Sequence, residues 1–220
     1  MNRVQRLVVA AAVGMMAASA VAGPPLLCFP YQCDETVSLA ETKRGKDHDG
    51  LVERTIKSLD EAKTTLGKME TIRRAVTAVG DNAALAHRLH ERLLARALDA
   101  SAEQKDAAGA LFVAGMWVAT ITQAGAKLDG EPGERYNMAG MAWVERAIEM
   151  DPGDAAKSFG AAVIAADKDR SIAQKHLKRA VAGAEQGSAL ARSIETNLVF
   201  GGKKIDEMRK DTKDETRAGK

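Results

Sequence analysis

Alanine is by far the commonest residue of this 220-residue chain, and it recurs beside leucine, valine and isoleucine at helical spacing. Only 4% of the residues are aromatic, whereas β-sandwiches and barrels draw on aromatic and β-branched side chains for their half-buried faces. Alanine, leucine, glutamate, lysine and arginine all favour helix. Hydrophobic residues make up 45% of the chain, which is enough for a buried core and is atypical of a disordered protein. We therefore predict an all-α fold.

The first 22 residues have the pattern of a secretory signal peptide. Arg3 and Arg6 precede an uncharged run over 7–22, and the small residues Ala20 and Ala22 suit a cleavage site. We predict cleavage after Ala22 and a periplasmic or secreted mature protein. The alternative is an uncleaved membrane anchor, for which the run is shorter than the roughly 20 residues that a spanning helix needs.

Export would also change the charge of the protein. Removal of residues 1–22 takes away two arginines and no acid, so the mature chain has 30 basic and 30 acidic residues. A neutral chain has no overall basic field for nucleic acid or anionic lipid. We therefore expect no nucleic-acid partner, and no membrane span after signal cleavage.

The next segment, residues 23–50, combines a proline-rich stretch with a polar linker. Three prolines between residues 23 and 33 predict an extended or turning strap without regular helix. In an oxidising compartment Cys28 and Cys33 are close enough in sequence to form a disulfide. The alternatives are a metal or redox role and two free or intermolecular thiols. Residues 34–50 are polar and charged, and we interpret them as a linker.

Two stretches resemble a group of uncharacterised secreted bacterial proteins. These are Gly23-Pro24-Pro25-Leu26-Leu27-Cys28, followed by Pro30, and Met69-Glu70-Thr71-Ile72-Arg73-Arg74-Ala75. A histidine usually follows the first cysteine in that group, whereas Phe29 follows Cys28 here. The resemblance implies secretion and an Ala-rich helical body, and it carries no activity.

Residues 51–202 show repeated helical spacing of large apolar side chains, bounded by turn residues. The predicted helices cover about 51–66, 69–79, 85–98, 102–124, 138–148, 155–166, 172–181 and 190–198. Side-chain caps are predicted at Asp81 or Asn82, at Ser101 within a Ser101–Gln104 capping box, at Asp154, at Asp169 or Ser171, and at Ser188. Residues 203–220 are highly charged and predict a solvated tail, partly helical or disordered.

Short turns between the predicted helices favour antiparallel hairpins stacked on one another. Residues 143–148 align with residues 176–181 at a spacing of 33, close to the tetratricopeptide repeat length of 34. Ala147–Pro152 also resembles the end of such a repeat. We therefore predict a degenerate α-α, tetratricopeptide-like repeat, with an irregular helical bundle as the alternative.

Few residues point to chemistry. His87 and His90 are three apart on one helix face and could contact a metal, but zinc needs a further protein ligand and the His-Glu-x-x-His order is missing. Trp117, Tyr136 and Trp143 are candidates for a ligand or partner groove, although aromatic residues of a helical protein more often pack in its core. Motifs for phosphate loops, nucleophile elbows and dinucleotide binding are missing from the sequence.

These observations favour an exported, non-catalytic interaction or scaffold protein of the bacterial envelope, without a cofactor, that binds a protein or peptide. The alternative is a small-molecule or metal-binding periplasmic protein, including an enzyme of unknown reaction, that uses the cysteine segment and a histidine.

Overall fold

The computed structural model describes residues 25–46, 48–103, 106–125, 133–166, 168–197 and 200–218. The predicted signal peptide, residues 1–22, lies outside these ranges. The described residues contain helices and no strand, and helix accounts for 72% of the structure. The prediction of an all-α fold is therefore confirmed.

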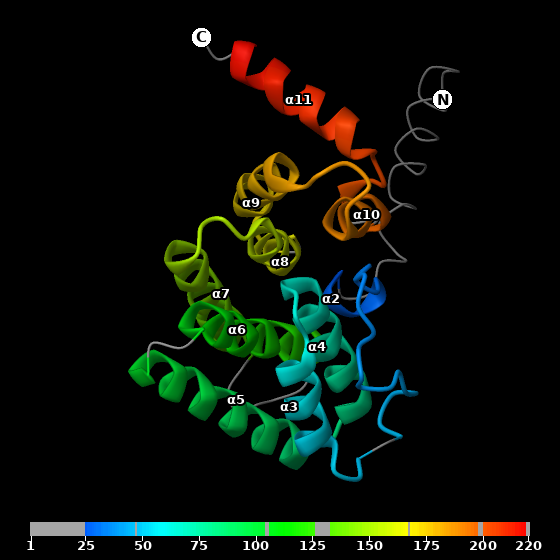
Figure 1. The fold of residues 1–220 in the computed structure, drawn as a ribbon, viewed down its shortest axis with the longest axis vertical. Coiled ribbons are helices and arrows are strands. Elements are labelled where there is room, and N and C mark those ends of the chain that lie inside the picture. Colours follow the sequence, from blue (N-terminus) through cyan, green and yellow to red (C-terminus); the bar gives the residue numbers. More distant parts are fainter. Residues whose placement is uncertain are drawn as a thin grey trace, which may run out of the picture.

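The described part of the chain contains ten helices, which pack against one another (Figure 1). Their bounds are α2 Pro25–Cys28, α3 Leu51–Glu61, α4 Thr65–Val79, α5 Ala83–Glu103, α6 Ala107–Gln123, α7 Gly133–Met150, α8 Ala155–Ala165, α9 Arg170–Gly183, α10 Ala189–Thr196 and α11 Ile205–Ala218. Helix α6 packs on α7, and α8 packs on α9. None of the helices in the described ranges is both long and apolar enough to cross a membrane.

Several of the predicted caps begin the helices that they were expected to begin. The side chain of Asn82 accepts a hydrogen bond from the Leu85 N–H at the start of α5. Asp154, Asp169 and Ser188 cap α8, α9 and α10 in the same way. Each cap satisfies a backbone donor that a helix start leaves free.

The capping box predicted at Ser101 is wrong. Helix α5 continues to Glu103, and the Ser101 hydroxyl donates to the carbonyl of Ala97, one turn earlier in the same helix. Asp106 caps α6 instead, by accepting from the N–H of Gly109. The reason is that Ser101 can bond within the last turn of α5, so its side chain is not needed as a cap.

Helix α6 is the centre of the core. Phe112, Met116 and Trp117 of this helix are fully buried. Gly115 and Gly140 allow α6 and α7 to approach closely, because a Cβ atom on Gly115 would lie 2.7 Å from the Gly140 carbonyl oxygen. A helix with apolar side chains on all sides is expected at such a position.

The proline-rich segment differs from its prediction. Pro25–Cys28 forms one turn of helix, α2, because proline is tolerated at the first position of a helix, where no intrahelical N–H bond is needed. The predicted linker is also packed against the body. Leu39 is buried, and its N–H donates to the hydroxyl of Ser58 on α3. We call residues 29–46 the strap.

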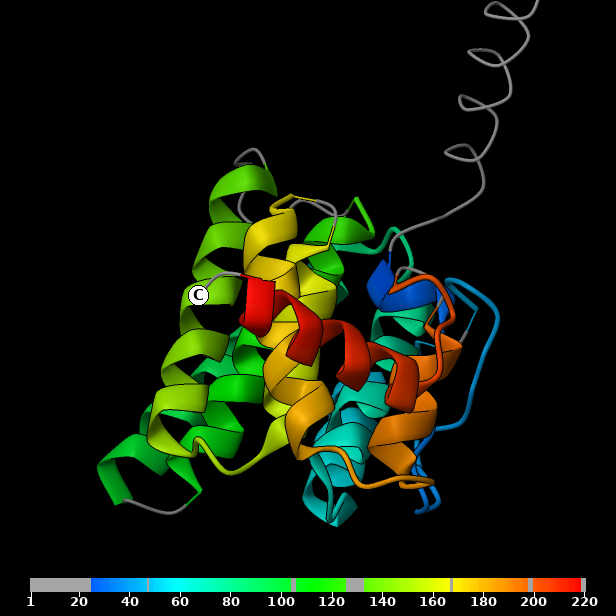
Figure 2. The same ribbon diagram turned by 90° about the horizontal axis from the view of Figure 1, so that it is seen from above.

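The charged C-terminal segment is a helix that lies across α9 (Figure 2). Its large apolar residues, Ile205 and Met208, are buried, although we expected a solvated tail. The guanidinium of Arg209 donates to the carbonyl oxygen of Ala184 just after α9. Spacing of three residues places both apolar side chains on one helix face, and that face meets the core.

Candidate functional site

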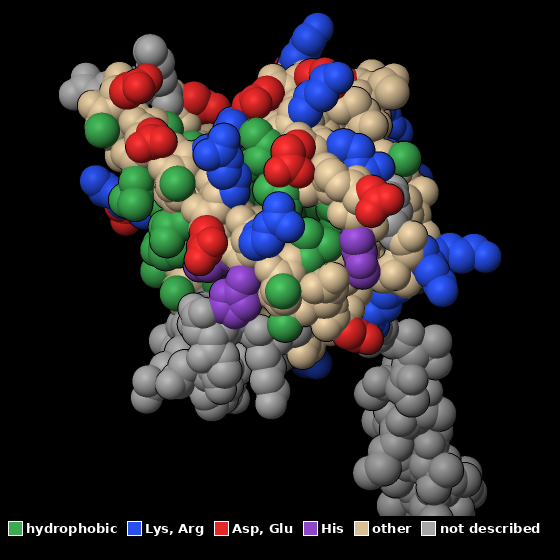
Figure 3. Space-filling model, turned by 90° about the horizontal axis from the view of Figure 1, so that it is seen from below, with side chains coloured by type: hydrophobic (Ala, Val, Ile, Leu, Met, Phe, Trp, Pro, Cys, Tyr) green, Lys and Arg blue, Asp and Glu red, His purple; other side chains and the backbone are tan. Residues whose placement is uncertain are grey.

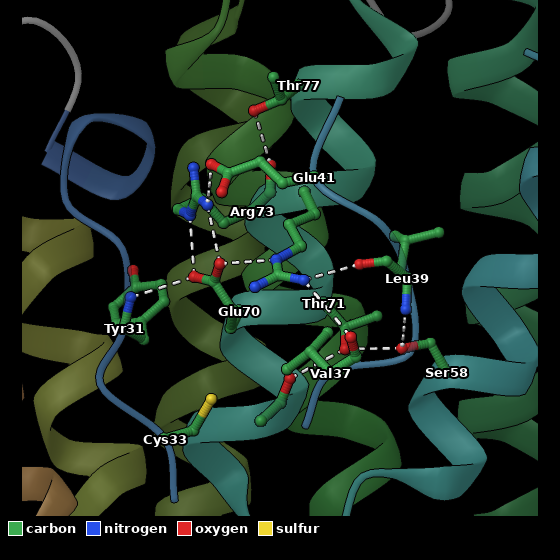
Figure 4. A network of polar contacts seen from close by, with 12 residues as sticks. Tyr31, Cys33, Val37, Leu39, Glu41, Ser58, Glu70, Thr71, Arg73 and Thr77 are labelled. Atoms are coloured by element: carbon green, nitrogen blue, oxygen red, sulfur yellow. Dashed lines mark hydrogen bonds and ion pairs between the residues drawn. The ribbon is translucent and has the colours of Figure 1, made fainter. Parts of the chain in front are cut away.

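One buried carboxylate holds the strap on α4 (Figure 4). Glu70 of α4 is 2% exposed. Its Oε2 atom accepts from the Tyr31 backbone N–H at 3.0 Å and from Arg73 Nε at 2.8 Å. Its Oε1 atom accepts from Arg73 at 2.7 Å and from Arg74 at 2.8 Å. The carboxylate is therefore saturated with donors, as a buried charge must be.

The charges in this network stabilise one another. Burial opposes ionisation of Glu70, but the hydrogen bonds and charge of Arg73, with those from Arg74 and Tyr31, hold the pKa of Glu70 below its ordinary value. Burial also opposes the charge of Arg73, and its bonds to Glu70 and Glu41 raise the pKa of the guanidinium. Both groups stay charged at neutral pH, so the ion pair between Glu70 and Arg73 persists there.

Arg73 and Arg74 also form hydrogen bonds to residues further along the strap. Arg73 donates to Glu41 at 2.8 Å, and Arg74 donates to the carbonyl oxygen of Leu39 at 2.8 Å. Further along, the Gly45 N–H donates to the Thr77 carbonyl oxygen. Gly80 at the end of α4 has a φ of 57°, and a Cβ atom there would lie 2.9 Å from the Gly45 backbone. Only glycine suits that position.

The other end of the strap reaches the C-terminal half of the chain. The Ser193 hydroxyl on α10 accepts from the Gln32 N–H at 2.8 Å and donates to the Gln32 carbonyl oxygen at 3.2 Å. Asp34 forms an ion pair with Arg192 of the same helix. The strap therefore ties α10 to α4 and closes the fold on itself.

The predicted disulfide between Cys28 and Cys33 is wrong, because both cysteines are free thiols. Cys28 is exposed at the end of α2, whereas Cys33 is half-buried and its Sγ lies 3.6 Å from the Glu35 carbonyl oxygen. Burial, followed by the charge of Glu70, raises the pKa of the Cys33 thiol. The hydrogen bonds of Tyr31 and Gln32 fix the chain between the cysteines, and Cys33 packs against the core.

An open groove lies between α3 and α5, on the face of the molecule shown in Figure 3. Its volume is about 860 Å³. Val52, Ile56 and Ala95 give it an apolar floor. Its charged lining residues are Glu53, Lys57, Asp60 and Glu61 from α3, and Arg88, Glu91 and Arg92 from α5. It is a concave surface of mixed chemistry that is open to solvent.

Several charges of this groove have no ion-pair partner in the described part of the chain. Lys57 lies 3.8 Å from Glu61, and Asp60 pairs with Arg96 at one end. Within the described ranges, no ion pair or side-chain hydrogen bond engages Glu53, Arg88, Glu91 or Arg92. Beyond the Asp60–Arg96 pair, a second pocket of about 380 Å³ continues between α5 and α6.

The predicted metal site is not assembled in this part of the chain. His87 and His90 are half-buried on α5, and both have interactions of their own. Among the residues that the structure describes, no group of three or more His, Cys, Asp or Glu side chains is placed to hold a metal ion.

The aromatic candidates are scattered. Trp117 is fully buried in α6 and has no surface to offer a ligand, whereas Trp143 of α7 is half-buried against the core. The side chain of Tyr136 lies outside the described residues. None of the groove residues was among the sequence candidates, because charged helix positions give no local signal that they face a groove.

Two further buried polar groups are structural. Lys157 of α8 is 4% exposed and pairs with Asp151 and Asp154, and Asp154 also accepts from the Thr65 hydroxyl of α4. His176 of α9 is buried with its Nε2 atom 3.5 Å from Glu145, yet neither ring nitrogen makes a hydrogen bond of good geometry with the described residues. Burial therefore dominates over Glu145 and lowers the pKa of His176.

Comparison of the chain with known protein families, curated proteins and solved structures finds no match.

Proposed function

We propose that this chain is an exported, non-catalytic helical scaffold of the bacterial envelope that binds a protein or peptide in the α3–α5 groove. The observation that carries the proposal is the groove itself. It combines an apolar floor with charged side chains that the described part of the chain leaves unpaired. Such charges keep their favourable hydration in the free protein, and they form ion pairs when a complementary surface docks.

The rest of the fold supports this role by packing against both helices of the groove. Helix α3 packs on α4 and is bonded to the strap through Ser58, whereas α5 packs on α6. A binding surface on helices is positioned more accurately than one on loops. Export is supported by the charge and apolar pattern of residues 1–22. It predicts that the intact mass of the isolated protein equals that of a chain starting at Gly23.

Site-specific photo-cross-linking in the exporting bacterium tests the proposal. A benzophenone amino acid would replace Ala95, which is exposed in the groove, or Ala182, which is exposed on α9. We expect a discrete adduct at position 95 whose mass spectrum identifies a polypeptide partner, and none at position 182. The same adducts at both positions, or none at position 95, would contradict the proposal.

A further inference from the structure

The two walls of the α3–α5 groove carry opposite charge. The α3 wall has three acidic residues and one basic residue, namely Glu53, Asp60, Glu61 and Lys57. The α5 wall has two basic residues and one acidic residue, namely Arg88, Arg92 and Glu91. The apolar floor of Val52, Ile56 and Ala95 lies between these walls.

The walls do not neutralise each other. Within the described residues of the groove, the pair between Asp60 and Arg96 is the one ion pair that joins α3 to α5, and it lies at one end. Arg88 and Arg92 are one helical turn apart and have no carboxylate partner there. Like charges at this spacing destabilise a helix, so the arrangement becomes favourable when an acidic partner lies against it.

The walls also restrict the backbone of the partner. Both walls are helices, whose N–H and C=O groups are already paired along the helix. An extended peptide would find no free backbone groups to pair with, as it does at a sheet edge, whereas a helix satisfies its own backbone and presents only side chains. Helix α3 has 11 residues and is therefore about 16 Å long, which matches about three turns of a partner helix.

We propose that the groove binds an amphipathic helix of the partner. This inference specifies the partner of the proposed function and rests on that function. An apolar stripe of that helix packs on Val52, Ile56 and Ala95. Its acidic flank lies against Arg88 and Arg92 of α5, and its basic flank lies against the α3 wall. Occupancy gives both walls partners and removes the floor from water.

Three stapled peptides of about three turns test this pattern. All carry the same leucine stripe. The first has glutamates along one flank and lysines along the other. The second has the same composition, with glutamate and lysine alternating on both flanks, and the third has lysine on both flanks. A peptide with its two flanks exchanged is no control, because turning it end for end restores the match.

Fluorescence anisotropy would measure the affinity of each peptide for the mature protein. We expect the first peptide to bind about tenfold more tightly than the second at low salt, because several exposed ion pairs each contribute modestly. We expect this ratio to shrink as salt screens the charges.

A charge reversal on one wall provides the matched test. Arg88→Glu with Arg92→Glu makes both walls acidic, so the third peptide should then bind about tenfold more tightly than the first. Arg170→Glu with Lys175→Glu changes the charge by the same amount on the exposed surface of α9. This control should keep the preference of the unmodified protein for the first peptide.

Equal binding of the first and second peptides by the unmodified protein would overturn the inference. So would a reversal variant that still prefers the first peptide. If none of the peptides binds but position 95 cross-links to a polypeptide in cells, the helical occupant is wrong and the proposed function stands. If position 95 captures nothing, the proposed function itself fails, and this inference falls with it.

Discussion

The strap and the groove use the same kinds of residues in opposite ways. Under the strap, Glu70 accepts four hydrogen bonds, and Arg73 and Arg74 are both engaged with it or with the strap backbone. In the groove, Arg88 and Arg92 have no such partners among the described residues. Charges that are buried and saturated hold a fold together, whereas exposed charges without partners are free to serve recognition.

Replacing the strap carboxylate should have the largest effect on stability. Glu70→Gln leaves Arg73 buried with too few acceptors, and breaking a buried pair on one side costs about 3–5 kcal/mol. Urea unfolding at pH 7 would measure this loss. Glu91→Gln in the groove is the matched control, and it should change the free energy of unfolding by less than about 0.5 kcal/mol. Similar losses for the two variants would contradict the contrast between the regions.

The difference between the regions also explains what the sequence could predict. Helix spacing and the caps at Asn82, Asp154 and Ser188 depend on neighbours within a few residues, so they are visible locally. The Glu70 network joins α4 to a strap about 40 residues away, and no local rule pairs them. In the sequence, the stretch around Glu70 is distinguished only by its resemblance to a group of uncharacterised secreted bacterial proteins.

The incorrect predictions also concern features that depend on contacts outside the local sequence. Ser101 has the composition of a cap, but helix α5 extends past it. Cys28 and Cys33 are near in sequence, yet both are free thiols, and bonds to α4 and α10 hold the backbone between them. The groove could not be predicted, because the distance between α3 and α5 is set by how both pack on the rest of the core.

The hydrogen bonds between the strap and Ser193 of α10 should contribute less to the free energy of unfolding than the Glu70 network. Ser193→Ala removes both hydrogen bonds to Gln32 and leaves its N–H and carbonyl oxygen without their partner, at a cost of about 2 kcal/mol. Thr196→Ala is the control on the same helix, because its exposed hydroxyl bonds, among the described residues, only to carbonyl groups of α10. Thermal or urea unfolding should show the larger loss for Ser193→Ala. Equal effects would mean that the strap is not tied to α10.

His176 tests what a buried group without good partners does. Because burial lowers its pKa in the folded protein, the unfolded chain takes up the proton first. Stability should therefore fall as the pH drops below about 6.5, the ordinary value for histidine. His176→Leu should reduce that fall, as measured by urea unfolding between pH 7.5 and 5. A gain of stability on acidification would instead indicate an ion pair with Glu145.

The smallest expected changes in the free energy of unfolding come from replacing two arginines of α5. Arg88→Ala removes a like-charge neighbour of Arg92 and should raise the free energy of unfolding by a few tenths of a kcal/mol, about 0.2–0.5. Arg96→Ala removes the partner of Asp60 and should lower it by up to about 1 kcal/mol. Denaturation midpoints at low salt would show the opposite signs. A clear loss with Arg88→Ala would mean that this residue supports the fold.

The most direct measurement of the central claim is the cross-link yield at position 95 in two charge-reversed proteins. In the Arg88→Glu and Arg92→Glu protein, the yield of the partner adduct should fall strongly while the unfolding midpoint stays close to that of the unmodified protein. In the Arg170→Glu and Lys175→Glu protein, the yield should be unchanged. Equal yields in the two proteins would contradict the claim that the unpaired charges of the α3–α5 groove recognise the partner.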